Sequence, residues 1–124
     1  ARWWQREGSG GQWTRGKSFD TFCPMGAIVA ADSVPDPQEL LLRTYVNGEV
    51  MQETSVGDLA FQIPDLISYI STITELVPGD VIATGTPSGV GLFRDPKVFM
   101  KPGDRIEVEI SGIGALRNVI AEEH

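Results

Sequence analysis

Hydrophobic and polar residues alternate on both sides of Asn47-Gly48 in the stretch "LLLRTYVNGEVMQETSV". Asn-Gly tolerates the positive φ angles that a type I′ turn demands, so the two runs predict a β-hairpin. Successive side chains of a strand point to opposite faces of a sheet. In the first strand, one face would hold Leu42, Thr44 and Val46, and the other Leu41, Arg43 and Tyr45.

A Pro-Gly-Asp triplet occurs twice, in "PGDVIATG" from Pro78 and in "PGDRIEVEI" from Pro102. Each triplet predicts a turn that leads into a strand, because glycine supplies the positive φ that such a turn requires. In the second strand the apolar residues alternate with charged ones, so one of its faces is expected to be in contact with water. Further strands are expected in the apolar run 27–31 and, after a turn, within 112–120.

One stretch has the period of a helix. Apolar residues recur at steps of three and four from Ile63 to Leu76, which predicts an amphipathic helix over that range. Pro64 suits a first helical turn, and Pro78-Gly79 would end the helix. Residues Arg6 to Gly16 are rich in glycine and polar groups and are expected to form a loop. These elements predict a mainly β fold with some α-helix.

The composition narrows the class of protein. A chain of 124 residues suits one domain, and 41% hydrophobic with 22% charged residues is ordinary for a globular protein. The formal net charge of -7 argues against nucleic-acid binding, and no apolar run is long enough for a membrane span. There is no signal-peptide pattern, and the single cysteine, Cys23, fits a reducing compartment. The expected location is the cytoplasm, or the mitochondrial matrix in a eukaryote.

Residues 11–18, "GQWTRGKS", match the pattern G-x-x-x-x-G-K-[ST] of phosphate-binding loops. Such a loop follows a buried strand and leads into a helix whose N-terminus faces the phosphate. Neither flank is present, because "ARWWQREGS" is not an apolar strand and Pro24 and Gly26 would end a following helix early. Two interpretations of Lys17 remain: a solvated surface lysine, or a cation that holds an anionic substrate in a groove.

Other candidates for chemistry are few. The loop "ATGTPSGVG" (83–91) offers the hydroxyl of Thr86 and glycines that let a ligand approach the backbone; a plain glycine-rich turn is the alternative. His124, the only histidine, is the last residue, so no Ser-His-Asp or Cys-His set is expected. Cys23 is interpreted as a buried small hydrophobe, and Trp3, Trp4 and Trp13 as packing or interface groups. The acidic residues form no ligand cluster on one element, so no metal ligand is assigned within the chain.

Four motifs, in this order along the chain, resemble the C-terminal part of the fumarylacetoacetate hydrolase family: "QWTRGKSFDTFCPMG", "VNGEVMQ", "PGDVIATGTPSGVG" and "KPGDRIEVEISGIGALRN". The chain is most similar to members that act on 2-oxo acids, acylpyruvates and oxaloacetate-like compounds. The resemblance implies a mixed β-roll fold, usually a homodimer. It also implies hydrolysis, decarboxylation or tautomerisation through an enolate that Mg²⁺ or Mn²⁺ stabilises.

The resemblance also implies roles for individual residues. Lys17 matches the family's active-site lysine and is the expected catalytic residue, which would also contact the substrate. Arg2 and Gln5 match the arginine and glutamine of the family's A-R-D-x-Q segment, which lines the substrate pocket. Thr86 matches a threonine whose hydroxyl holds the substrate carboxylate.

Two departures from the family pattern qualify these roles. Trp3 stands where the family has aspartate, which removes any ion pair made there. The family's acidic metal ligands and its His–Glu dyad would lie before Ala1. Residues 1–124 are therefore expected to be the C-terminal part of a single catalytic domain, incomplete on its N-terminal side and inactive alone.

A non-catalytic remnant that serves as a binding or assembly module is the alternative to this enzyme. The expected partners are a small oxo acid and either a second copy of the chain or the missing N-terminal segment. Neither nucleic acid nor a membrane is expected as a partner.

Overall fold

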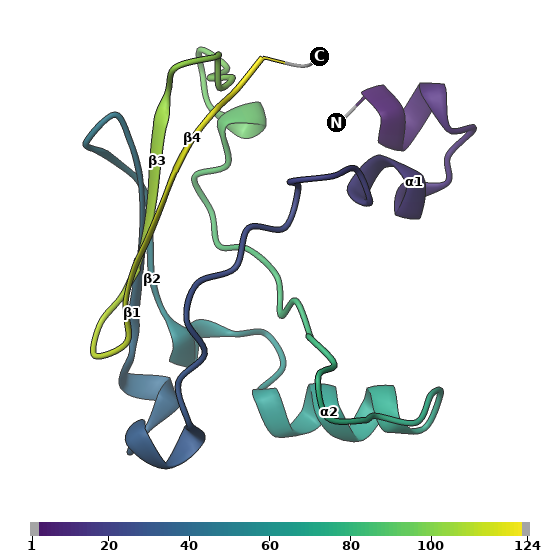
Figure 1. Cartoon of the computed structure of the whole chain (residues 1–124), viewed down its shortest axis with the longest axis vertical. Coiled ribbons are helices and arrows are strands. Elements are labelled where there is room, and N and C mark those ends of the chain that lie inside the picture. The colour runs from purple at the N-terminus through teal and green to yellow at the C-terminus, as the bar shows by residue number, and fades with distance from the viewer. Residues whose placement is uncertain (1–2, 123–124) are drawn as a thin grey trace.

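The computed structural model describes residues 3–122, and a four-stranded antiparallel sheet dominates it (Figure 1). The strands are β1 (Leu41–Val46), β2 (Glu49–Ser55), β3 (Arg105–Ile110) and β4 (Gly114–Val119). The helices are α1 (Trp13–Lys17) and α2 (Ile63–Ser71), with a π-helical turn η1 (Trp4–Gly8) and the 3₁₀ turns η2 (Ala31–Ser33), η3 (Pro37–Glu39), η4 (Val56–Asp58) and η5 (Gly91–Phe93). The mainly β fold with some α-helix is thus confirmed.

The predicted hairpin is also confirmed. β1 and β2 pair around Asn47 and Gly48, whose φ angles of 52° and 86° are of the sign that a type I′ turn needs. The register shifts between Thr44 and Tyr45, where Met51 of β2 has no opposite residue. Such a β-bulge takes one residue out of the ladder and leaves its backbone groups to other partners.

The sheet has one polar face. β1 lies between β2 and β3, and β4 pairs with the outer edge of β3. Three cross-strand pairs of hydrogen-bonded side chains lie on this face: Arg43 with Glu53, Tyr45 with Glu109, and Arg117 with Glu107. The Tyr45 hydroxyl donates to the Glu109 carboxylate at 3.0 Å, and this hydrogen bond raises the pKa of Tyr45. This is the water-facing side that the charged alternation predicts.

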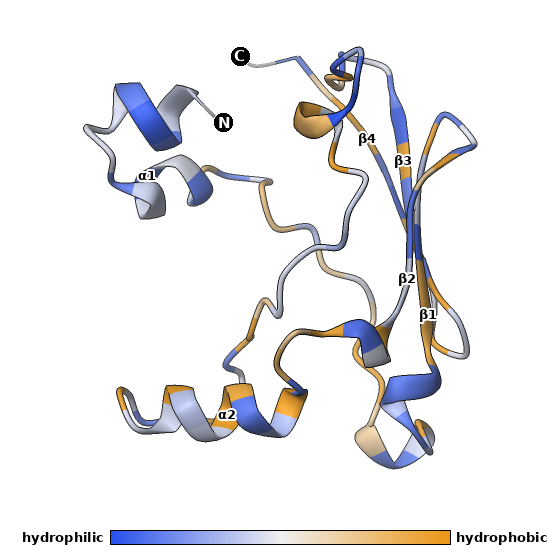
Figure 2. Cartoon of the chain, turned by 180° about the vertical axis from the view of Figure 1, so that it is seen from behind, coloured by the Kyte–Doolittle hydropathy of each residue, from blue (hydrophilic) through white to orange (hydrophobic). Residues whose placement is uncertain are grey.

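The opposite face of the sheet is apolar. The register assigns to it Leu42, Val46, Ile106, Val108, Ile110 and Leu116. None of these side chains is fully buried, and neither is any other hydrophobic side chain among residues 3–122. α1 and α2 lie on one side of the sheet, at its opposite ends, and extended segments connect them (Figure 1). Apolar residues also mark α2 (Figure 2), where Ile67 is 44% exposed. The described residues therefore carry apolar surfaces that they do not cover themselves.

The loop predicted over Arg6–Gly16 is wrong, because η1 and α1 occupy much of this range. Aromatic packing overrides the low helix propensity of the glycines here. The Trp4 ring centre lies 5.0 Å from that of Trp3 and 5.6 Å from that of Phe19. The guanidinium of Arg15 lies over Trp4 at 4.7 Å. Trp4 therefore packs against aromatic neighbours, whereas Trp3 and Trp13 are 57% and 50% exposed.

Two predicted strands are absent from the described part of the chain. Residues 27–31 and the stretch after Pro78 pair with no strand there, because a strand forms only where a sheet edge accepts it. Cys23, interpreted as buried, is exposed, since the segment around it packs into no core.

The helix predicted to reach Leu76 ends at Ser71. The hydroxyls of Ser71 and Thr72 donate to the carbonyls of Ser68 and Tyr69 at 2.8 and 2.7 Å, and such bonds compete with the helical ladder. No helix among residues 3–122 has the length and apolar character to cross a membrane.

The two Pro-Gly-Asp turns are built alike. Each aspartate accepts a hydrogen bond from the backbone N–H three residues earlier, at 2.8 Å for Asp80 and 2.7 Å for Asp104. Asp104 also accepts from Asn47 Nδ2 at 2.9 Å, and Asn47 Oδ1 accepts from the N–H of Arg105. The bond from Asn47, followed by the backbone bond, lowers the pKa of Asp104. Asp104 thus ties the hairpin turn to the start of β3.

Replacing Asp104 by asparagine is expected to lower Tm at neutral pH and to weaken its response to acid. A carboxyl whose folded-state pKa is lowered stabilises the fold above its unfolded pKa of about 4. This contribution disappears as the pH falls through the folded-state pKa. Thermal unfolding over this acid range should show the Tm difference between wild type and Asp104→Asn shrinking. Asp80→Asn is the matched control, because it removes the same turn contact without touching Asn47; equal losses at neutral pH would contradict the role of Asn47.

Candidate active site

Lys17 is the last residue of α1, and it is exposed. Its Nζ lies 5.7 Å from the centre of the Trp13 ring, within reach of a cation–π contact. The hydroxyl of Ser18 donates to the Thr14 carbonyl at 2.7 Å where the helix ends. A phosphate-binding loop places its lysine at the start of a helix, so α1 gives the nucleotide interpretation no support. An exposed ammonium on a helical backbone is well suited to an anionic ligand.

Gln5 lies in η1, directly against α1. A Cβ added to Gly16 would lie 2.6 Å from Gln5 Cγ and 2.8 Å from Gln5 N, so the two segments cross where only glycine fits. Gly16 is buried and immediately precedes Lys17. The structure therefore brings Gln5 and Lys17 into one aromatic-rich unit. Arg2, the third candidate from this segment, lies outside the described residues, as does His124.

Thr86 is exposed in the loop 83–91, and β2 holds this loop. Gln52 Nε2 lies 3.0 Å from Thr86 Oγ1, 3.0 Å from the carbonyl oxygen of Pro87 and 3.3 Å from that of Ser88. Gln52 stands opposite Thr44 in the register, on the apolar face of the sheet, and is half-buried. One amide thus organises three consecutive residues of the loop.

Arg94 fastens the far end of the same loop. Its Nη2 donates to the Met51 carbonyl at 2.6 Å and its Nε to the Gly89 carbonyl at 3.0 Å. This carbonyl is free to accept the bond from Arg94 because the bulge takes Met51 out of the β1–β2 ladder. No sequence motif singled out Gln52 or Arg94 for a role. The one signal that could have pointed to Gln52 is a glutamine on the apolar face of the hairpin.

The candidates form two groups, Gln5 with Lys17 and Thr86 with Gln52. Within residues 3–122 no hydrogen bond or ion pair joins Lys17 to Thr86. No group of three or more His, Cys, Asp or Glu in this part of the chain could hold a metal ion. The described side chains therefore do not fit a Mg²⁺ or Mn²⁺ site by themselves. They offer a ligand an ammonium and a hydroxyl, which suit an anion.

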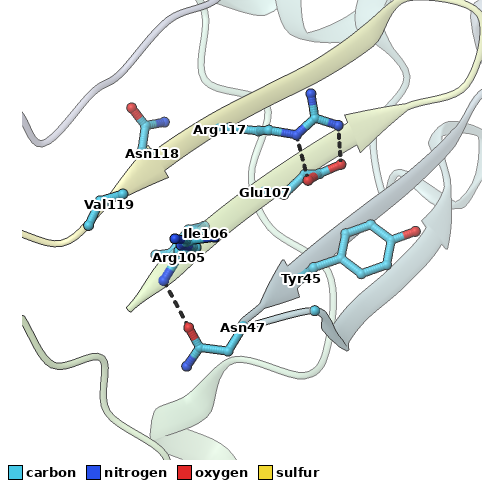
Figure 3. A pocket seen from close by; sticks show the side chains of 9 residues that line it. Tyr45, Asn47, Arg105, Ile106, Glu107, Arg117, Asn118 and Val119 are labelled. Atoms are coloured by element: carbon cyan, nitrogen blue, oxygen red, sulfur yellow. Dashed lines mark hydrogen bonds and ion pairs between the residues drawn. The ribbon is translucent and has the colours of Figure 1, made fainter. Parts of the chain in front are cut away.

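A pocket of about 940 Å³ lies away from both groups, beside the β1–β2 turn (Figure 3). Several of its polar groups already have protein partners. Arg117 contacts both oxygens of Glu107, at 2.7 and 2.9 Å, and the Arg105 N–H donates to Asn47 Oδ1 at 2.9 Å. This pocket contains none of the predicted site residues, and its contacts are those of cross-strand pairs.

The sheet, the anchored loop and the lysine-bearing unit define a β-rich domain with donors for an anionic ligand. The family model described as fumarylacetoacetate (FAA) hydrolase C-terminal matches residues 1–121. The chain belongs to the fumarylacetoacetate hydrolase family, as its motifs predict.

Two relatives named as oxaloacetate tautomerases are similar to nearly the whole chain. The chain is 49% identical over 121 residues to oxaloacetate tautomerase FAHD2A, mitochondrial, of Bos taurus, a match that covers 97% of this chain and 38% of the relative. The identity to the Homo sapiens protein of the same name is also 49%, with the same coverage. The chain therefore spans 38% of the length of these relatives.

Solved structures confirm the fold of the family. Fumarylacetoacetate hydrolase from psychrophilic Exiguobacterium antarcticum matches with a TM-score of 0.91 and 41% identity, over 99% of this chain and 44% of that chain. Maleylpyruvate hydrolase from Sphingobium sp. SYK-6, in complex with manganese(II) ion and pyruvate, matches with a TM-score of 0.78 and 40% identity, over 90% of this chain and 39% of that chain.

Proposed function

We propose that the protein is an enzyme acting on a 2-oxo or 1,3-dioxo acid of the oxaloacetate or acylpyruvate type. The observation that carries this proposal is the match of nearly the whole chain to relatives named for such substrates, an oxaloacetate tautomerase and a maleylpyruvate hydrolase. The reaction would be hydrolysis, decarboxylation or tautomerisation through an enolate. The scaffold alone does not choose among them, because one fold hosts several chemistries.

The proposed roles follow the donors that the residues carry. The Lys17 ammonium would stabilise the negative charge that develops on a substrate oxygen as the enolate forms. The Thr86 hydroxyl would donate to the substrate carboxylate, and Arg2 and Gln5 would line the pocket. Exposure of Lys17 and Thr86 supports these roles, since both side chains are accessible to a ligand.

We also propose that residues 1–124 form the C-terminal part of one catalytic domain whose Mg²⁺ or Mn²⁺ ligands lie outside this chain. The shorter span relative to the relatives, the uncovered apolar faces and the lack of a ligand cluster in the described part support this. Such an ion supplies Lewis-acid chemistry when bound. A preceding segment or a second copy in a homodimer would cover the apolar faces.

The proposed compartment is the cytoplasm or the mitochondrial matrix, and the free thiol of Cys23 suits either one.

A non-catalytic binding or assembly module is the second candidate. Trp3 favours it, because this residue replaces a family aspartate and packs instead of pairing. Its ring is edge-on to Trp4, and a Cβ on Gly8 would lie 2.4 Å from it.

The deciding experiment is an assay of the complete protein with oxaloacetate and with an acylpyruvate, each in the presence of Mg²⁺ or Mn²⁺. Loss of the enol absorbance and chromatography of the products would identify the reaction, and calorimetry would measure pyruvate binding. The proposal expects turnover far above the buffer rate with at least one substrate. A protein that neither turns over these acids nor binds pyruvate with either ion would be the assembly module instead.

A further inference from the structure

We propose that Gln52 is a positioning residue for substrate binding: it fixes the Thr86 hydroxyl as a hydrogen-bond donor toward the substrate carboxylate. The inference rests on the proposed function, because it requires a carboxylate substrate at Thr86. It adds a residue of β2 to a site otherwise composed of loop and helix residues.

The partners of Gln52 determine which way its amide faces. Its Nε2 lies 3.0 and 3.3 Å from the carbonyl oxygens of Pro87 and Ser88. Carbonyl oxygens only accept hydrogen bonds, so the amide must turn its nitrogen, and not its oxygen, toward the loop. The same nitrogen lies 3.0 Å from Thr86 Oγ1. Gln52 is therefore the donor in this contact and the threonine oxygen is the acceptor.

This assignment controls the direction of the Thr86 proton. A hydroxyl has one O–H donor and two lone pairs. Since Gln52 donates to a lone pair, the O–H must point to a different acceptor. Thr86 is exposed, so that acceptor is solvent or a ligand. At neutral pH a carboxylate only accepts hydrogen bonds, so it is the ligand that complements this O–H donor.

The position of the hydroxyl is set by the sheet. Gln52 and its neighbour Met51 hold the loop at two points, because the Met51 carbonyl is bridged to Gly89 through Arg94. Sites supported by strands are more precise than sites built on loops alone. The bulge in β2 thus serves the loop that carries Thr86.

The test is Gln52→Glu in the complete protein, which keeps the shape of the side chain but places an acceptor opposite three oxygens. We expect the Kd for pyruvate and the KM for oxaloacetate to rise by about 10- to 100-fold, with a much smaller change in kcat. Acidification should restore pyruvate binding by this variant, because the introduced carboxyl becomes a donor when it is protonated. Gln52→Met, which has no donor at any pH, should show the same loss without the recovery.

Gln62→Glu is the matched control. Gln62 Nε2 also donates to two backbone carbonyls, those of Gly57 and Leu59 at 3.3 and 3.2 Å, but it has no contact with Thr86. Its pyruvate Kd should equal that of the wild type. Thr86→Val should raise the pyruvate Kd much less in the Gln52→Met background than in the wild type, because the two substitutions remove the same interaction.

The outcomes separate this inference from the proposed function. If the wild type binds pyruvate and both Gln52 variants bind it equally well, the inference is overturned while the proposed function stands. If the wild type neither binds pyruvate nor turns over oxaloacetate or an acylpyruvate, both are overturned. Circular dichroism verifies folding, and Gln52→Met decides the question if Gln52→Glu does not fold.

Discussion

A Lys17→Met variant of the complete protein should turn over oxaloacetate about 10²- to 10³-fold more slowly than the wild type, with its fold intact. This is the range observed when one preorganised donor to a developing oxyanion is removed. The fold should survive because Lys17 is exposed and its contact with Trp13 is a surface cation–π pair, worth about 0.5–1 kcal/mol. Steady-state kinetics, with thermal unfolding of the same samples, measure both effects.

Two further lysine variants make this prediction specific. Lys97→Met removes an exposed lysine from a different segment and should leave turnover unchanged. Lys17→Arg keeps the charge but presents it as a planar fork, so it should recover only part of the rate. Wild-type turnover in Lys17→Met would exclude Lys17 from the mechanism.

The elements that the sequence predicted correctly depend on local information. Asn47-Gly48 defines the hairpin turn by itself, because both residues have the positive φ that the turn needs. The alternation in β3 divides its side chains between a polar and an apolar face, and the register with β1 agrees with it. The Pro-Gly-Asp turns were equally predictable, since each is closed by its own aspartate.

The two strands that were wrongly predicted fail because their pairing depends on contacts that are distant in the sequence. The run 27–31 has the composition of a strand, but pairing requires a sheet edge that this segment does not meet among the described residues. Just before it, Gly26 lies near Leu116 of β4, where an added Cβ would be 3.8 Å from the leucine side chain. The run itself remains exposed, with Ile28 93% accessible, so its apolar composition did not specify a ladder.

The residues of the candidate site also fall into two kinds: those that local sequence predicts and those that depend on contacts distant in the sequence. Lys17 and Thr86 were found through motifs, and the glycine-rich loop was evident from composition. The role of Gln52 depends on a contact 34 residues along the chain, and that of Arg94 on a bulge at Met51, 43 residues away. No local pattern encodes such distances, because the bulge and the loop meet only in the folded sheet.

Gly89→Ala should both destabilise the protein and displace the Thr86 loop from β2. Gly89 has a φ of 96°, and an added Cβ would lie 2.2 Å from the Met51 carbonyl oxygen, the same atom that Arg94 contacts. A left-handed backbone costs a non-glycine residue about 1–2 kcal/mol, and overpacking adds about 1–3 kcal/mol. The free energy of unfolding should therefore fall by about 2–5 kcal/mol, as urea denaturation would measure. Because relief of the clash moves the loop off β2, the KM for oxaloacetate should rise as well.

Gly79→Ala isolates the contribution of the contact with β2. Gly79 has a φ of 103°, but an added Cβ there would meet nothing within 4 Å. The free energy of unfolding of this variant should therefore fall only by the backbone contribution, about 1–2 kcal/mol, and its KM for oxaloacetate should stay unchanged. If Gly89→Ala lost no more stability than Gly79→Ala, the loop would not pack against the bulge as the structure shows. A larger loss in Gly89→Ala, accompanied by a raised KM, would instead show that the bulged strand holds the loop in its binding position.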